Sequence, residues 1–302
     1  MQRGLKAVGL CPWGFIQGNK EMVNKSPEEI NKIPYNSNVE TKRKEPIPLN
    51  PNHTHFILID DGYRYTFFGS GGITKCVGNF EKMISSPQPA GLGIPLVTII
   101  VEGGTDAIFE AKDHLANGQP CVVIDGSGRA ADIIAYAHRH AIKATNESGF
   151  KLKQGNIKHI EEMLEDSFSD RLKGEEGNRR KKTFTNWVIE CIRYADLISV
   201  FDIRSEDNLD YNILTSLLKG TDLNTYSQLY LAMVWDRVDI AEEKIFSKRD
   251  LQIEKRSLDE VMKKASLMEQ TNFVELGWRL RSLLGLQVTS TLVLFISTSY
   301  LS

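Results

Sequence analysis

The stretch that decides the fold runs from Ile94 to Ala137 and reads IPLVTIIVEGGTDAIFEAKDHLANGQPCVVIDGSGRAADIIAYA. Two short apolar runs, Leu96–Val101 and Cys121–Ile124, have the length and β-branched content of buried parallel strands. Each run ends at an acidic residue and a turn of small residues, after which a helical pattern begins. A strand, a turn and a helix, twice in succession, form the unit of an open α/β sheet, in which ligands bind beyond the carboxyl ends of the strands.

The two turns, Glu102–Thr105 (EGGT) and Asp125–Arg129 (DGSGR), are the candidate ligand-binding elements. Glycines let the main chain approach a ligand closely, and the free N–H groups at a helix start favour anions, phosphates above all. Arg129 can add a two-pronged donor to a phosphate. The predicted ligand-binding residues are Gly103, Gly104, Thr105, Gly126, Ser127, Gly128 and Arg129.

A second interpretation of these turns stays open. Neither fits GxGxxG or a P-loop, so both can be ordinary tight β–α turns. In that case Arg129 pairs with a nearby carboxylate, such as Asp125 or Asp132, and stabilises the turn.

Size and composition are those of an ordinary globular protein: 302 residues, 41% hydrophobic and 25% charged, enough for one large domain or two smaller ones. The formal net charge of -2 gives no reason to expect nucleic acid or anionic lipid as a partner. The four cysteines are scattered without a CxxC pair, which indicates reduced thiols and a cytosolic location. We expect no signal peptide and no insertion of this chain into a membrane, because no apolar run approaches the ~20 residues that a spanning helix needs.

A third strand of the same kind is predicted at His55–Ile59, within HTHFILIDD. His53 and His55 share one face at strand spacing, so they can ligate a metal or simply pack. We favour packing and predict no metal site, because no third ligand lies near in sequence. The strands His55–Ile59, Leu96–Val101 and Cys121–Ile124 are expected to be parallel neighbours.

The remaining N-terminal segments are less informative. Leu5–Leu10 is a candidate strand, Gly18–Pro51 a polar surface loop, and Ile73–Ile84 a helix. The aromatic, glycine-rich segment Gly62–Gly72 either packs as a hairpin or lays a ring against a purine.

From Lys151 the pattern is helical. Leu152–Leu172 and Thr183–Phe201 have helical periodicity, and we interpret the charged segment Lys173–Lys182 between them as a solvated loop. Short helices follow at Asn208–Lys219, Tyr226–Trp235, Asp239–Phe246 and Ser257–Met268, an order typical of a stacked array. The sequence therefore predicts an α/β, Rossmann-like domain over 1–150, an α-helical region over 151–275, and an irregular tail over 276–302 that opens with a helix-like stretch from residue 276.

Catalytic motifs are absent: there is no nucleophile elbow, no HExxH and no P-loop. Glu102 and Asp125 end adjacent strands, where such residues more often cap the next helix or hold ribose hydroxyls. We therefore predict no enzyme.

Five segments, in this order, resemble one family: GLCPWGFIQG (9–18), LNPNHTHFILIDDG (49–62), VEGGTDAI (101–108), CVVIDGSGRAADIIA (121–135) and LYLAMVWDRVDIAEEKIF (229–246). The series resembles the cytosolic N-terminal homology region of the melastatin-type transient receptor potential (TRPM) cation channels. Two departures, the lack of the family's upstream glycine-rich strand and of its transmembrane helices, lead us to expect a fragment of such a channel.

The resemblance implies a Rossmann-like, nucleotide-sensing SLOG domain and an ankyrin-like helical array beneath a homotetrameric, often calcium-permeable pore. It implies no certain cofactor, but ADP-ribose or a related nucleotide as ligand, with Arg129 at the place of the arginine that contacts it. A second basic contact of the family falls at Val77, with Lys75 nearby. The implied partners are other channel subunits, at the cytoplasmic face of the plasma membrane. Two alternatives remain: a nucleotide or ribose-phosphate hydrolase of the related LOG type that uses Glu102 or Asp125, and a purely structural assembly domain with an empty pocket.

Overall fold

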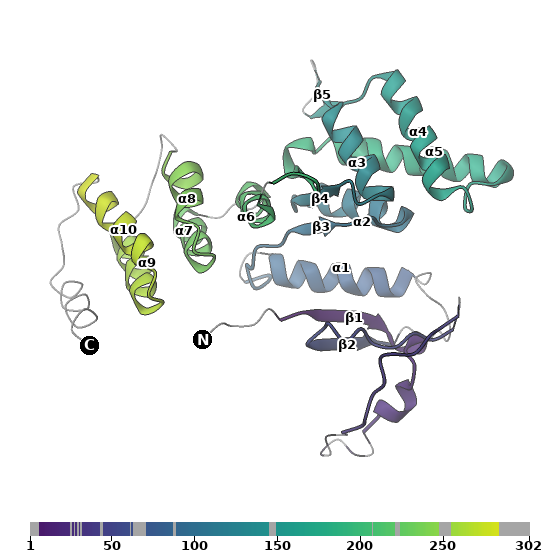
Figure 1. Cartoon of the computed structure of the whole chain (residues 1–302), viewed down its shortest axis with the longest axis horizontal. Helices are drawn as coiled ribbons and strands as arrows, with labels where there is room; N and C mark the ends of the chain where they lie inside the picture. Colours follow the sequence, from purple (N-terminus) through teal and green to yellow (C-terminus); the bar gives the residue numbers. More distant parts are fainter. Residues whose placement is uncertain are drawn as a thin grey trace. The chain divides into compact units, whose positions relative to one another are not determined.

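The computed structural model describes residues 6–24, 26, 28, 30, 32–42, 45–60, 62, 71–86, 89–144, 149–206, 208–220, 224–247 and 255–283 (Figure 1). The chain divides into two compact units, residues 1–94 and 95–302. The predictions for most of the aromatic segment 62–72 and for the tail after residue 283 lie outside the described residues.

The first unit contains a two-stranded parallel sheet. Strand β1 (Val8–Pro12) pairs with β2 (His55–Ile59), with Val8 opposite His55. Helix α1 (Gly71–Ser85) confirms the helix expected at 73–84. The strand at His55–Ile59 is also confirmed, but its hydrogen-bonded neighbour is β1 and not one of the strands at 96–101 and 121–124. That part of the prediction is wrong, because similar apolar runs do not reveal which of them pair.

The second unit is built on a parallel sheet in the order β3-β4-β7. Strand β3 (Thr98–Ile100) leads to α2 (Thr105–Ala116), and β4 (Cys121–Asp125) leads to α3 (Arg129–Arg139), which confirms the two strand–turn–helix units and the α/β, Rossmann-like class. All five residues of β4 are buried, as expected for a strand covered on both faces.

Helices of the second unit pack on both faces of this sheet. Cys121 and Val123 belong to a core that includes α2, α3, α4 (Gln154–Phe168) and α5 (Gly174–Ile192). Successive side chains of a strand point to opposite faces of the sheet, and Ser199 of β7 faces away from this core. There it accepts a hydrogen bond from the Ser216 hydroxyl of α6 (Leu209–Gly220), at 2.7 Å between the two Oγ atoms.

Two predictions for residues 173–201 are wrong. The expected helix at Thr183–Phe201 ends at Ile192, and Ile198–Asp202 form β7, which pairs with β4 from Cys121 opposite Ile198 to Asp125 opposite Asp202. A short 3-10 turn, Ala195–Leu197, separates the two elements, and its apolar residues continue the helical spacing, so periodicity does not show the break.

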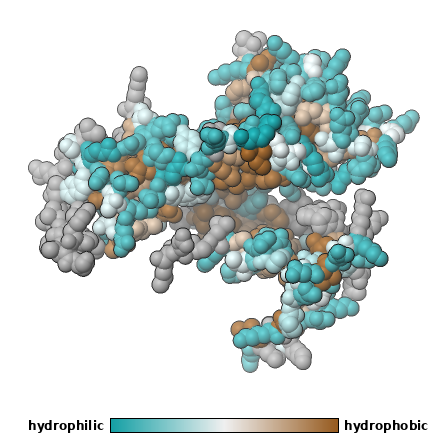
Figure 2. Space-filling model, in the orientation of Figure 1, coloured by the Kyte–Doolittle hydropathy of each residue, from teal (hydrophilic) through white to brown (hydrophobic). Residues whose placement is uncertain are grey.

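The charged segment Lys173–Lys182 is not a loop but, from Gly174 on, the first half of α5. Its charges pair along and between helices: Arg180 Nε lies 3.3 Å from Glu176 Oε1, and Lys181 reaches Glu165 of α4. Figure 2 shows mostly hydrophilic residues over α4 and α5, as expected for a solvated helix surface. A short antiparallel pair, β5 (Ile142–Lys143) with β6 (Phe150–Lys151), precedes α4.

The predicted helical array follows the sheet. It comprises α7 (Thr225–Val234), α8 (Val238–Ile240) with a π-helix at Ala241–Phe246, α9 (Lys255–Leu267) and α10 (Thr271–Leu283), packed around a second apolar core. The domain boundaries at 150 and 275 stay predictions. Among the described residues, no helix has the length and apolar character that a membrane crossing requires.

Candidate functional site

The two predicted turns meet at the carboxyl edge of the β3-β4-β7 sheet. Because β3 and β4 are parallel neighbours, the turns that follow them lie side by side. The backbone N–H of Glu102 donates to Ser127 Oγ at 2.8 Å, and the N–H of Ala131 donates to the Glu102 carbonyl at 2.8 Å. The Ser127 hydroxyl in turn donates to the Ile124 carbonyl at 2.6 Å. The structure thus brings together the seven predicted site residues in one hydrogen-bonded pair of turns.

Both turns need backbone angles that favour glycine. The φ angles are 85° at Gly103, 85° at Gly126 and 103° at Gly128. A Cβ added to Gly103 would lie 2.8 Å from the Ala107 Cβ, too close for any side chain. Arg129 itself has φ 52°, which costs a non-glycine residue about 1–2 kcal/mol. Such strain is concentrated at functional sites, where the surrounding structure maintains it.

Several polar groups of the two turns already have partners within the chain. The Thr105 side chain is buried, and its hydroxyl accepts a hydrogen bond from Arg171 Nη1 at 2.9 Å. The N–H groups of Gly126 and Gly128 donate to Asp132 Oδ1 at 2.7 and 3.0 Å. The second turn is therefore preorganised by this chain's own carboxylate.

Arg129, at the start of α3, places a cation at this edge. Its guanidinium carbon lies 5.3 Å from the centre of the Phe168 ring. The two carboxylates that were the alternative partners are otherwise engaged: Asp125 accepts from both terminal nitrogens of Arg139, and Asp132 accepts from the two glycine N–H groups. The guanidinium of Arg129 donates to neither of them.

The turn after β7 also reaches this edge, and sequence reasoning missed it. A Cβ on Gly126 would lie 3.0 Å from Ile203 Cγ2 and 3.6 Å from Arg204 Nε. Arg204 pairs with Asp202, at 2.9 Å between Nε and Oδ1, and this hydrogen bond holds the pKa of Asp202 below its usual value. An apolar run ending in an acidic residue, ISVFD, is the same signal that marked the other strands.

The two carboxylates of the hydrolase alternative, Asp125 and Glu102, differ in burial and in hydrogen-bond partners. Asp125 is only 6% exposed and is held by Arg139, while its carbonyl accepts the N–H of Ile203 at 3.0 Å. Glu102 is exposed. The buried carboxylate therefore has a structural partner, and no described contact gives it a role as acid or base.

The two histidines of the HTH segment do not converge on a common point. The His53 ring packs on Phe56, with 5.4 Å between ring centres, and His55 Nδ1 lies 2.9 Å from Thr54 Oγ1. Among the described residues, no group of three side chains is placed to hold a metal ion.

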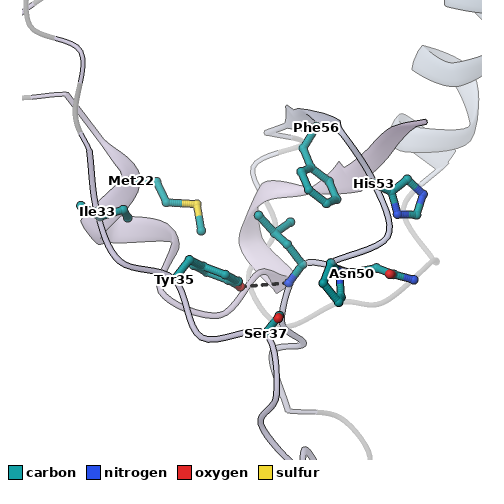
Figure 3. Close-up of a pocket in the computed structure, with 9 residues that line it drawn as sticks. Met22, Ile33, Tyr35, Ser37, Asn50, His53 and Phe56 are labelled. Atoms are coloured by element: carbon teal, nitrogen blue, oxygen red, sulfur yellow. Dashed lines mark hydrogen bonds between the residues drawn. The ribbon is translucent and has the colours of Figure 1, made fainter. Parts of the chain in front are cut away.

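A separate cavity of about 460 Å³ lies in the first unit (Figure 3). The Tyr35 hydroxyl braces it, accepting the Leu49 N–H at 3.0 Å and donating to the Gln17 carbonyl at 3.1 Å. None of the predicted site residues lines it. Its walls contain no Lys, Arg, Asp or Glu side chain; they are formed by Met22, Ile33, Tyr35, Ser37, Leu49, Asn50, Pro51, His53 and Phe56.

Comparison with known proteins gives a consistent picture. Residues 1–189 match the LSDAT_euk family, described as SLOG in TRPM. The chain is 33% identical over 279 residues to human transient receptor potential cation channel subfamily M member 6, covering 91% of this chain and 13% of that protein. It is 33% identical over 281 residues to member 7 of Rattus norvegicus (91% and 14%) and 28% identical over 279 residues to the channel trpm of Drosophila melanogaster (89% and 13%). The chain thus spans only a small part of the length of these relatives.

Proposed function

Since this chain belongs to the TRPM family and carries its N-terminal SLOG region, we propose that it is the cytosolic nucleotide-sensing and assembly region of a cation channel. The relatives are named as cation channels, and a region of this kind would act through other subunits of the same assembly. Ligand would bias the channel by binding one conformation more tightly than another.

The ligand we propose is ADP-ribose or a related nucleotide, bound at the paired turns after β3 and β4. The observation that carries this assignment is Arg129: a strained residue at the start of α3 whose guanidinium donates to neither Asp125 nor Asp132. The start of α2 lies next to it, since the Ala130 N–H donates to the Gly103 carbonyl at 3.4 Å. A phosphate between Arg129 and the first N–H groups of α2 would meet both a cation and a helix N-terminus.

A regulatory role fits these contacts better than a catalytic one. The buried carboxylate at the end of β4, Asp125, is bonded to both terminal nitrogens of Arg139. No described contact favours the hydrolase alternative.

The test measures thermal stability with and without ADP-ribose for wild type, Arg129→Ala and Arg129→Lys. Arg179→Ala, which removes an exposed arginine from α5, is the matched control. We expect Arg129→Ala to unfold at nearly the wild-type temperature without ligand but to lose the ligand-induced rise, since a hydrogen bond to a charged group contributes about 1.5–3 kcal/mol, or roughly 10- to 100-fold in affinity. Lysine should restore only part of it, because an ammonium lacks the two-pronged geometry.

Three results would contradict the proposal. An equal ligand-induced rise in Arg129→Ala and wild type would remove Arg129 from the site. Turnover of the nucleotide would favour the hydrolase. Absence of any rise in wild type would favour an assembly domain with an empty pocket.

A further inference from the structure

A carboxylate of this chain already lies where an anion would bind at the second turn. Asp132 Oδ1 accepts the N–H of Gly126 at 2.7 Å and the N–H of Gly128 at 3.0 Å. Two N–H groups that converge on one oxygen form a concave anion site of the kind that holds phosphates elsewhere. Asp132 also lies in the first turn of α3, where the helix dipole favours negative charge. The carboxylate of Asp132 therefore occupies the position in this turn that an external anion would prefer.

The charge of Asp132 is not cancelled by an ion pair. Arg204 faces it from the turn after β7, but this arginine is bonded to Asp202, with 2.9 Å between Nε and Oδ1. Arg139, on the same helix, is bonded to Asp125. Among the described residues, the donors bonded to the Asp132 carboxylate are two neutral backbone N–H groups, so a phosphate brought to this turn would meet a like charge that is not in an ion pair.

The second oxygen of the Asp132 carboxylate, Oδ2, can accept a hydrogen bond from a ligand. Among the described residues, no donor is bonded to Asp132 Oδ2, and the residue is half-buried. A hydroxyl group can donate to it, whereas the ionised pyrophosphate bridge of ADP-ribose has no proton to donate. Carboxylates at the corresponding edge of dinucleotide-binding sheets accept the hydroxyls of a ribose in this way.

We propose that Asp132 determines the specificity of the second turn: it excludes a phosphate from that turn and accepts a sugar hydroxyl there, which leaves the phosphate to Arg129 and the start of α2. This inference rests on the nucleotide site proposed above. If Asp132 only stabilised the start of α3 as a cap, substituting it would change the melting temperature. It would not change whether the turn accepts a charged phosphate or a neutral hydroxyl.

The test follows the backbone amide signals of Gly126 and Gly128 by NMR while inorganic phosphate is added to chains that carry Arg129→Ala, which removes the phosphate position proposed next to Gly128. With Asp132 in place these two signals should not move. In Asp132→Ala, which empties the anion position, they should shift and saturate. Asp132→Asn, which keeps an acceptor but removes the charge, should give the same gain at higher phosphate concentration and serves if the alanine variant does not fold. Asp166→Asn, an exposed carboxylate on α4, should behave as wild type.

A titration with ADP-ribose, on chains that keep Arg129, separates the two proposals. We expect Asp132→Ala to weaken its binding by roughly 10-fold or more, the loss of a hydrogen bond to a charged acceptor. Phosphate shifts in Arg129→Ala with Asp132 in place, or none when a folded Asp132 variant carries it, would overturn the role of Asp132 whatever ADP-ribose does. A gain of phosphate shifts in the variants, with no binding of ADP-ribose to wild type, would support exclusion by Asp132 and refute the nucleotide assignment.

Discussion

Ser127 joins the two turns of the proposed site, and its removal should separate them. Its Oγ accepts the Glu102 N–H at 2.8 Å and donates to the Ile124 carbonyl at 2.6 Å, so one hydroxyl links the turn after β3 to the end of β4. Ser127→Ala deletes both hydrogen bonds without adding volume. The backbone around it can stay in place, because the glycines on either side set its conformation.

The expected cost follows from the surroundings of the two bonds. A typical hydrogen bond contributes about 0.5–1.5 kcal/mol net, so two give about 1–3 kcal/mol. The Glu102 N–H is exposed and regains a partner from water, which places the expected loss in unfolding free energy at about 1–2 kcal/mol. For a domain of about 200 residues this corresponds to a fall of roughly 2–8 °C in Tm.

The assay is urea unfolding of wild type, Ser127→Ala and Ser169→Ala, with ADP-ribose binding measured on each. Ser169 is exposed at the end of α4 and forms none of the hydrogen bonds described, so its alanine variant should match wild type. Ser127→Ala should lose stability as worked out above and bind ADP-ribose more weakly, because the first turn is no longer fixed against the second. Equal stability of the two variants would refute the claim that the turns are held together by this hydroxyl.

Three further predictions concern other parts of the chain. Arg281→Ala should destabilise the helical array by about 3–5 kcal/mol in denaturant unfolding, because its guanidinium is 1% exposed and bonded to Asp259. Arg279→Ala, at a side chain 63% exposed, should cost under about 1 kcal/mol. Equal losses in the two variants would contradict the burial of Arg281. Burial lowers the pKa of His138 below its ordinary 6.5, so its contribution to stability is complete above that value and is lost as the pH falls below it. The unfolding free energy should therefore fall from pH 7.5 to 5.5 more in wild type than in His138→Gln, and identical slopes would exclude this histidine. Burial raises the pKa of Cys121 to about 12, so iodoacetamide at pH 7.5 should label the exposed Cys76 and spare Cys121 until denaturant is added, as read by mass spectrometry; early labelling of Cys121 would argue against a closed core.

The sequence allowed the central strand–turn–helix units to be predicted because their signals are local. The apolar run at 121–124 is too short and too β-branched for a helix, and the glycines that follow it can adopt positive φ angles. The family resemblance came from the same segments together with others, and the match over residues 1–189 agrees with it.

What could not be predicted depends on contacts between distant residues. The strand at Ile198–Asp202 is fixed by pairing with β4, some 75 residues earlier, while its own sequence continues a helical spacing. The partner of His55–Ile59 likewise depends on a pairing across more than forty residues. At the candidate site, glycines and Arg129 were recognisable, but the occupation of the Gly126 and Gly128 N–H groups by Asp132 was not, because Asp132 could equally have paired with an arginine.

The most direct test of nucleotide binding at the paired turns is hydrogen–deuterium exchange of the wild-type chain with and without ADP-ribose. Binding at the paired turns predicts slower exchange on ligand addition in peptides covering the start of α2 and the start of α3, next to Thr105 and Arg129. Peptides that line the cavity around Tyr35 should be unchanged. Unchanged exchange at both helix starts under saturating ADP-ribose, or protection confined to the Tyr35 cavity, would contradict it.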